Sequence, residues 1–365
     1  MTETPCGFAS GHLGLKRKSR PLIMHHINSL AYFRADNLFV LGDKRGNIAL
    51  VEPSNLDAVF ETNVGNTTIQ AIGVCEAHRL VVTLNKDFSV TILRLSDGKL
   101  DVIASINGLE HMVEDGYQVA FSESQEIAGT TAETVIFIDS GGIDRCDVGA
   151  AVRDLAFIGT DGVLACLEDG KLIEIQWRHP MSSRTVFRSA GEPIWSLAIN
   201  PDNKTIAVGE RMGRIVILNR DESGSMEEVI STSSRIPKRM KWLNREILLV
   251  VHSSAIDRIS YIEGKWSHEE NFYNGQSNTV EDFLILENGR FLVGITYNKL
   301  ILVWDVATGE LLSSSYWDFD YAKGMLLEKN SKNEFYVYGR DMVMKKFCLH
   351  DAQVNCLKIF EKTNS

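Results

Sequence analysis

The residue types that could carry catalysis or bind a metal occur in this sequence without the spacing that such chemistry needs. There is no phosphate loop of the GxxxxGK[ST] or GxGxxG type, no GxSxG nucleophile turn and no HExxH motif. The neighbours His25 and His26 would point to opposite faces of a strand, which does not suit one metal ion. Asp139 and Asp144 read as part of a turn rather than a calcium loop. We therefore expect no catalytic residue, no metal and no cofactor.

The densest charge is a basic run near the N-terminus, formed by Lys16, Arg17, Lys18 and Arg20. One interpretation is a solvated tail before the folded part of the chain. The other is a contact to phosphates, as in RNA, or a nuclear-import signal. A second basic group consists of Arg235, Lys238, Arg239, Lys241 and Arg245. Alternation along a strand would divide this group between two faces and dilute it.

Composition bounds the class of protein. The 365 residues are 44% hydrophobic and carry a formal net charge of -10. This share of apolar residues is enough for a large core, and the acidic balance argues against a general nucleic-acid coat. We expect no membrane insertion and no secretion, because no apolar run approaches the ~18 residues of a spanning helix and no leader is evident. Six scattered cysteines without C-x-x-C spacing favour a reducing compartment, the cytosol or nucleus.

The elements that must position any functional residue follow from an internal repeat of a short apolar run, a turn, a second run, a polar turn and a third run. Runs of period-two alternation separated by such turns indicate β-hairpins. Aligned on the first run, the repeats register at eight positions, 36 to 47 residues apart. These positions are Asn28, Gln70, Tyr117, Arg153, Trp195, Lys238, Glu281 and Ala322.

A repeat of ~40–45 residues with several strands is typical of a β-propeller blade. We therefore predict an all-β propeller of four-stranded blades, with eight blades favoured and seven as the alternative. Residues 27–365 would form this single domain, and residues 1–26 a basic tail or a closing strand. A ring avoids exposed first and last sheets, and one blade commonly takes strands from both chain ends. Residues 21–24 could supply that strand, as could residues 352–362.

The stretch LILVWDVATGELL, residues 300–312, resembles a WD repeat, with Trp304 and Asp305 ending a third strand. Weaker matches are ILRLSDGKL at 92–100 and NPDNKTIAVGERMGRIVILN at 200–219, and the resemblance extends over about residues 27–361. It implies a WD40-like propeller whose first strands lie nearest the axis and whose docking face is the rim where those strands begin.

That rim would gather the eight register positions. The turns between second and third strands should face the same way, adding Lys44, Arg45, Arg211, Met212, Tyr297 and Arg340. Aromatic side chains and arginine are frequent interface anchors. We therefore expect a non-catalytic scaffold that docks a protein partner in a multi-subunit assembly. Alternatives are a non-catalytic subunit of an RNA-modifying or RNA-processing complex, and a propeller enzyme.

Overall fold

The computed structural model contains eight antiparallel sheets of four strands, which we number sheets 1 to 8 along the chain. It describes residues 27–53, 58–76, 78–87, 89–106, 119–121, 127–131, 134–138, 143–159, 162–177, 180–220, 225–232, 236–252, 255–276, 278–319, 321–328, 331–339 and 344–360. No helix in these ranges is long and apolar enough to cross a membrane.

The first four sheets follow the chain in order. Sheet 1 consists of β1 (Ile27–Phe33), β2 (Leu38–Asp43), β3 (Asn47–Val51) and β4 (Ala58–Asn63). Sheet 2 consists of β5 (Ile69–Cys75), β6 (Leu80–Asn85), β7 (Val90–Ser96) and β8 (Lys99–Ile106). Sheet 3 consists of β9 (Val119–Phe121), β10 (Ile127–Thr131), β11 (Thr134–Ile138) and β12 (Ile143–Asp147). Sheet 4 consists of β13 (Val152–Ile158), β14 (Gly162–Leu167), β15 (Lys171–Gln176) and β16 (Ser182–Arg188).

The remaining sheets repeat this order. Sheet 5 consists of β17 (Ile194–Ile199), β18 (Thr205–Glu210), β19 (Arg214–Asn219) and β20 (Ser225–Ser231). Sheet 6 consists of β21 (Arg239–Trp242), β22 (Ile247–Val251), β23 (Ile256–Ile262) and β24 (Lys265–Tyr273). Sheet 7 consists of β25 (Val280–Leu286), the short 3-10 turn η1 (Glu287–Gly289), β26 (Phe291–Thr296), β27 (Leu300–Asp305) and β28 (Leu311–Tyr316). Sheet 8 consists of β29 (Ala322–Leu327), β30 (Glu334–Gly339), β31 (Met344–His350) and β32 (Gln353–Phe360).

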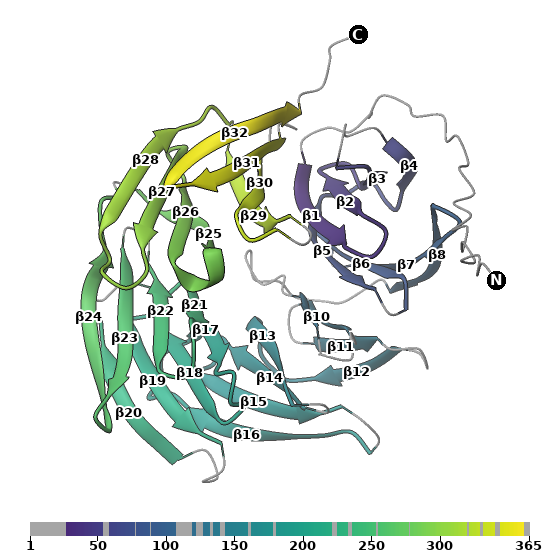
Figure 1. Cartoon of the computed structure of the whole chain (residues 1–365). Coiled ribbons are helices and arrows are strands. Elements are labelled where there is room, and N and C mark those ends of the chain that lie inside the picture. Colours follow the sequence, from purple (N-terminus) through teal and green to yellow (C-terminus); the bar gives the residue numbers. More distant parts are fainter. Residues whose placement is uncertain are drawn as a thin grey trace, which may run out of the picture.

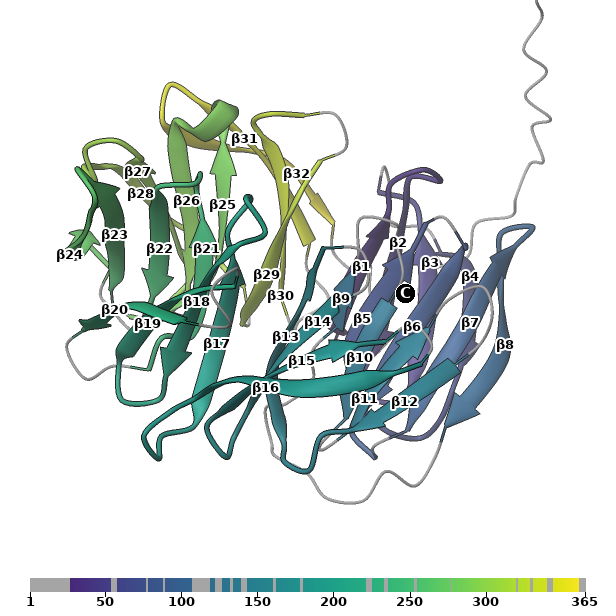
Figure 2. The ribbon, with the colours of Figure 1, turned by 90° about the horizontal axis from the view of Figure 1, so that it is seen from below.

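The sheets stand in a ring in chain order (Figure 1). Seen from the side, β8 and β24 lie at opposite outer edges, with β1, β13 and β17 between them (Figure 2). Second strands such as β6 and β14 are buried along their whole length, whereas the fourth strand β16 is largely exposed. Middle strands read as continuous apolar runs because neighbouring sheets cover both of their faces. The expected all-β fold with four-stranded blades is confirmed.

Apolar clusters join neighbouring sheets around the ring. They lie between sheets 1 and 2, 3 and 4, 4 and 5, 5 and 6, 6 and 7, and 7 and 8. Sheets 2 and 3 meet where β5 and β6 approach β9 and β10. The last contact closes the ring, because Phe39 and Met344 belong to one buried cluster that spans sheets 1 and 8. Phe39 meets the Tyr336 ring edge-on at 5.0 Å.

The described residues contain no strand that is exchanged between the chain ends. Sheets 1 and 8 each hold four strands of consecutive sequence. The C-terminal segment forms β32, which pairs only with β31 at the outer edge of sheet 8. Residues 21–24, the other candidate, lie outside the described residues. Among the described residues, side-chain packing between Phe39, Tyr336 and their neighbours joins sheets 1 and 8.

Candidate functional site

The register positions coincide with an irregularity at the start of the innermost strands. The ladder between first and second strands skips one residue in sheets 1, 2, 4, 5, 7 and 8. The skipped residues are Asn28, Gln70, Arg153, Trp195, Glu281 and Lys323. Such a bulge leaves one residue unpaired and re-aims its side chain. In sheet 6, the N–H of Lys238 donates to Val251 O (2.8 Å), the residue that pairs with Arg239.

The predicted register position in sheet 8, Ala322, is wrong by one residue. Ala322 is fully buried and pairs with Gly339, so it belongs to the core between sheets 7 and 8. The bulge that corresponds to Arg153 and Trp195 falls on Lys323. The first run of sheet 8, AKGMLLE, therefore aligns on its lysine rather than on the small alanine before it.

The turns between second and third strands lie beside the starts of the first strands. The N–H of Arg211 donates to Pro193 O (2.9 Å) and that of Tyr297 donates to Thr279 O (2.8 Å), and each acceptor directly precedes its first strand. The predicted turn residues Lys44, Arg45, Arg211, Met212 and Tyr297 are exposed there. We call this edge, where the first strands begin and these turns lie, the start rim. Tyr117 and Arg340 lie outside the described residues, as do Lys16, Arg17, Lys18 and Arg20.

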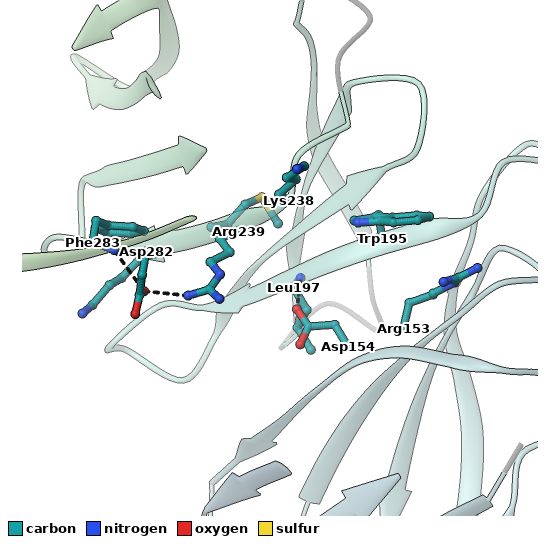
Figure 3. A pocket seen from close by; sticks show the side chains of 10 residues that line it. Arg153, Asp154, Trp195, Leu197, Lys238, Arg239, Asp282 and Phe283 are labelled. Atoms are coloured by element: carbon teal, nitrogen blue, oxygen red, sulfur yellow. Dashed lines mark hydrogen bonds and ion pairs between the residues drawn. The ribbon is translucent and has the colours of Figure 1, made fainter. Parts of the chain in front are cut away.

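Three of the predicted residues line one cavity at this rim. Arg153, Trp195 and Lys238 come from sheets 4, 5 and 6 and meet around a space of about 490 Å³, which we call the inner cavity (Figure 3). The remaining lining residues are Asp154, Leu197, Arg239, Met240, Lys241, Asp282 and Phe283. All of these lie in or directly before the innermost strands β13, β17, β21 and β25. The cavity is thus built on regular sheet rather than on loops.

Arg153 and Trp195 form the aromatic and cationic wall of the inner cavity. The guanidinium carbon lies 4.6 Å from the centre of the Trp195 ring, within the range of a cation–π contact. Its Nη2 donates to Glu168 Oε1 (2.8 Å), and the arginine side chain is only 9% exposed. Arg153 Nε is buried without an acceptor among the described residues. A buried charged donor that lacks an acceptor is costly, and Arg153 is one of the residues that line the cavity.

Asp154 and Asp282 were not predicted from the sequence as site residues. Each directly follows a bulged residue, Arg153 or Glu281, along its strand. Asp154 accepts hydrogen bonds from the N–H groups of Leu155 (2.9 Å) and Leu197 (2.8 Å), the latter in the next sheet. Asp282 accepts hydrogen bonds from the N–H groups of Phe283 (2.9 Å) and of Met325 in sheet 8 (2.9 Å). Each carboxylate caps an inward-facing backbone group that has no further strand to pair with. The matching sequences VRDL (residues 152–155) and VEDF (residues 280–283) could have predicted that these two aspartates play equivalent roles.

The charge of Asp154 is strongly affected by its position. Burial raises its pKa to about 6, against the lowering influence of the Leu155 and Leu197 N–H groups and of Arg239. Arg239 itself pairs with Asp282 Oδ1 (2.6 Å) across sheets 6 and 7. Lys238 and Lys241 are exposed, and Lys241 Nζ lies 5.8 Å from the Phe283 ring centre. Of the basic group of sheet 6, Lys238, Arg239 and Lys241 line the same cavity, whereas Arg245 does not and Arg235 lies outside the described residues.

The other predicted rim residues are not gathered at this cavity. Asn28 Nδ2 donates to Ile69 O (2.9 Å) and to Gln70 Oε1 (3.2 Å), which ties sheet 1 to sheet 2. Glu281 Oε2 accepts from the Tyr321 hydroxyl (3.4 Å). Arg45 and Arg211 lie on the turns of sheets 1 and 5 and do not line the inner cavity.

Tyr297, on the turn of sheet 7, lies near Tyr321 rather than in the inner cavity. The two rings meet edge-on at 4.9 Å, and Tyr297 is half exposed. Among the described residues, the inner cavity occupies the side of the start rim from sheet 4 to sheet 7.

Other buried charges connect strands rather than form a second site. Glu174 binds Arg184 of its own sheet (2.7 Å) and Arg220 of sheet 5 (2.6 Å). Asp257 accepts from both His252 (3.1 Å) and His268 (2.9 Å) within sheet 6. Among the described residues, no three His, Cys, Asp or Glu side chains are grouped to hold a metal ion.

Comparisons with known proteins bear on the fold. No family model matches the sequence, and no curated protein matches it. Among solved structures, the computationally designed Ika8 protein is 17% identical with a TM-score of 0.70, over 90% of this chain and 98% of that chain. The β-propeller domain of Cps50 (Swd1) from Myceliophteria thermophila is 11% identical with a TM-score of 0.57, over 94% of this chain and all of that chain. At such low identity the likeness concerns architecture alone. Together with the ring of four-stranded sheets, it identifies this chain as a β-propeller.

Proposed function

We propose that this chain is a non-catalytic interaction platform, a WD-repeat-like propeller of eight blades. Its start rim would dock a peptide or a domain of a partner protein within a larger assembly. The inner cavity is the docking point that the geometry favours. The free cysteines Cys75, Cys146, Cys166, Cys348 and Cys356 support a reducing compartment, cytosolic or nuclear.

The observation that carries this proposal is the joint placement of Arg153, Trp195 and Lys238 around one cavity. Tryptophan and arginine are the side chains that most often dominate binding energy at protein interfaces. They stand here on β13 and β17, which Asp154 joins by accepting a hydrogen bond from the Leu197 N–H. A partner would therefore meet a preorganised surface, and little ordering entropy would oppose docking.

Partner capture by purified variants tests the proposal. We expect Trp195→Ala to reduce capture by about tenfold or more, as loss of an interface anchor does. Its melting temperature should stay near that of the wild type, because the indole is only partly buried and lines a cavity. The measurement is affinity capture with quantitative mass spectrometry beside thermal unfolding.

Trp266→Ala is the matched control. Trp266 is also partly buried, but it lies on the outer strand β24 against Trp242 (5.7 Å) and Tyr261 (4.9 Å). This variant should keep its partners even where it loses stability. If Trp195→Ala retains every partner, or if it unfolds more readily than Trp266→Ala, the inner cavity is not the docking point.

A further inference from the structure

The charge of the inner cavity is opposite to that of the chain. The whole chain carries -10, yet the cavity is lined by four cationic side chains and only two carboxylates. Both carboxylates are already engaged. Asp154 accepts from two backbone N–H groups. Asp282 accepts from two more and from Arg239. The remaining field in the cavity is therefore positive and favours an anionic ligand.

Two of the cations have unused capacity for such a ligand. Arg153 has one bond to Glu168, while its buried Nε has no acceptor among the described residues. Lys238 is exposed and has no acidic partner within the described part of the chain. Trp195 and Met240 add apolar surface between these charges. An anion that also carries an apolar group would use both features.

The surroundings favour a peptide over a nucleic acid. Strands of RNA are bound along continuous basic grooves that offer successive aromatic faces for stacking. Here one face of Trp195 is covered by Arg153, and Phe283 is only 7% exposed. Isolated carboxylates next to an apolar side chain match this pattern better.

We propose that the inner cavity binds a short acidic segment of a protein partner, with carboxylates at Lys238 and Arg153 and an apolar side chain against Trp195. This inference rests on the proposed docking function and specifies the chemistry of the partner. It assigns Lys238 and Lys241 the role of attracting the acidic segment. Exposed cations at an interface mainly raise the association rate and select partners of opposite charge.

Fluorescence anisotropy with a short labelled peptide of glutamates around a central leucine tests the inference. We expect this peptide to bind the full chain and its glutamine counterpart not to bind. The double variant Lys238→Gln/Lys241→Gln should weaken binding by about tenfold. Lys265→Gln is the control, because Lys265 is an exposed lysine at the outer edge of the same sheet. It should leave the affinity unchanged.

Three results would overturn the inference. The glutamate peptide does not bind, or Lys265→Gln weakens it as much as the double variant, or oligouridylate of the same net charge binds more tightly than the peptide. The proposed function has a separate readout. If capture of natural partners depends on Trp195 but the glutamate peptide does not compete with it, the docking function is supported and an acidic partner segment is excluded. Loss of the dependence on Trp195 would instead remove the docking function itself.

Discussion

At the scale of the residue, neighbouring positions of an innermost strand have two different roles. The bulged second position gives Arg153 and Trp195 to the inner cavity. The third position reaches the next sheet, where Ser196 Oγ donates to a backbone carbonyl of sheet 6 (2.6 Å) and Asp154 and Asp282 accept from backbone N–H groups. The innermost strand has a free edge, so each such bond satisfies a backbone group that no other strand can pair. Different side chains therefore connect the sheets and line the cavity.

This division predicts a specific effect of pH through Asp154. Its pKa is raised by burial to about 6, so between pH ~4 and ~6 the folded chain holds a proton that the unfolded chain has released. The contribution of this carboxyl to stability is thus full below pH ~4 and is lost as the pH rises through 6. Asp154→Asn should flatten the fall in the free energy of unfolding across this window, measured by urea denaturation at a series of pH values.

Asp101→Asn serves as the reference, because Asp101 is exposed on the outer strand β8. Its profile should run parallel to that of the wild type. A slope between pH 4 and 6 that is the same in the wild type and in Asp154→Asn would show that Asp154 does not titrate as its burial implies.

At the scale of the element, alternation and spacing were enough to predict the sheets, and the register positions proved to be the bulges for Arg153, Trp195 and Glu281. The inner cavity was only partly predictable. Strand alternation assumes regular pairing, and the irregular start of sheet 6 brings Lys238 to the same cavity as Arg239. The bridging partners of the aspartates lie one repeat further along the chain, a relation that no local pattern expresses.

Gly209 on β18 tests how closely neighbouring sheets approach at these bulges. It pairs with Ser196, and an added Cβ would lie 2.6 Å from both Ser196 Oγ and Pro237 Cγ of the next sheet. Gly42 pairs with Ser29 in the same way in sheet 1. We expect Gly209→Ala to destabilise the fold by ~1–3 kcal/mol, since overpacking shifts the backbone. Chemical denaturation measures this.

The same substitution at Gly65 is the comparison, since the nearest atom to an added Cβ there is 4.0 Å away. Gly65→Ala should be close to neutral. Equal effects at Gly209 and Gly65 would mean that the cost is one of backbone conformation and that the sheets do not meet as closely as described.

At the scale of the whole molecule, the contact that closes the ring among the described residues is made by side chains. Sheets 1 and 8 hold strands from opposite ends of the chain, and one cluster containing Phe39, Tyr336 and Met344 joins them. Every other contact between sheets is also supported by the continuous chain. The contact between sheets 1 and 8 is held by packing without a chain connection between the two sheets, so its local stability should decide how cooperatively the ring unfolds.

Phe39→Ala should reveal this through hydrogen exchange. Truncation of a buried phenylalanine costs ~3–5 kcal/mol, and at this contact the loss should appear first as opening of the two end sheets. We expect faster exchange in β1, β2, β29 and β30, with sheets 4 to 6 still protected under the same conditions. Phe335→Ala is the counterpart, because Phe335 is equally buried but packs between sheets 7 and 8, which the chain connects. Its effect should not extend to sheet 1. Uniformly faster exchange in all sheets of the Phe39 variant would mean that the ring unfolds as one unit, so that closure by packing is as firm as closure by a strand.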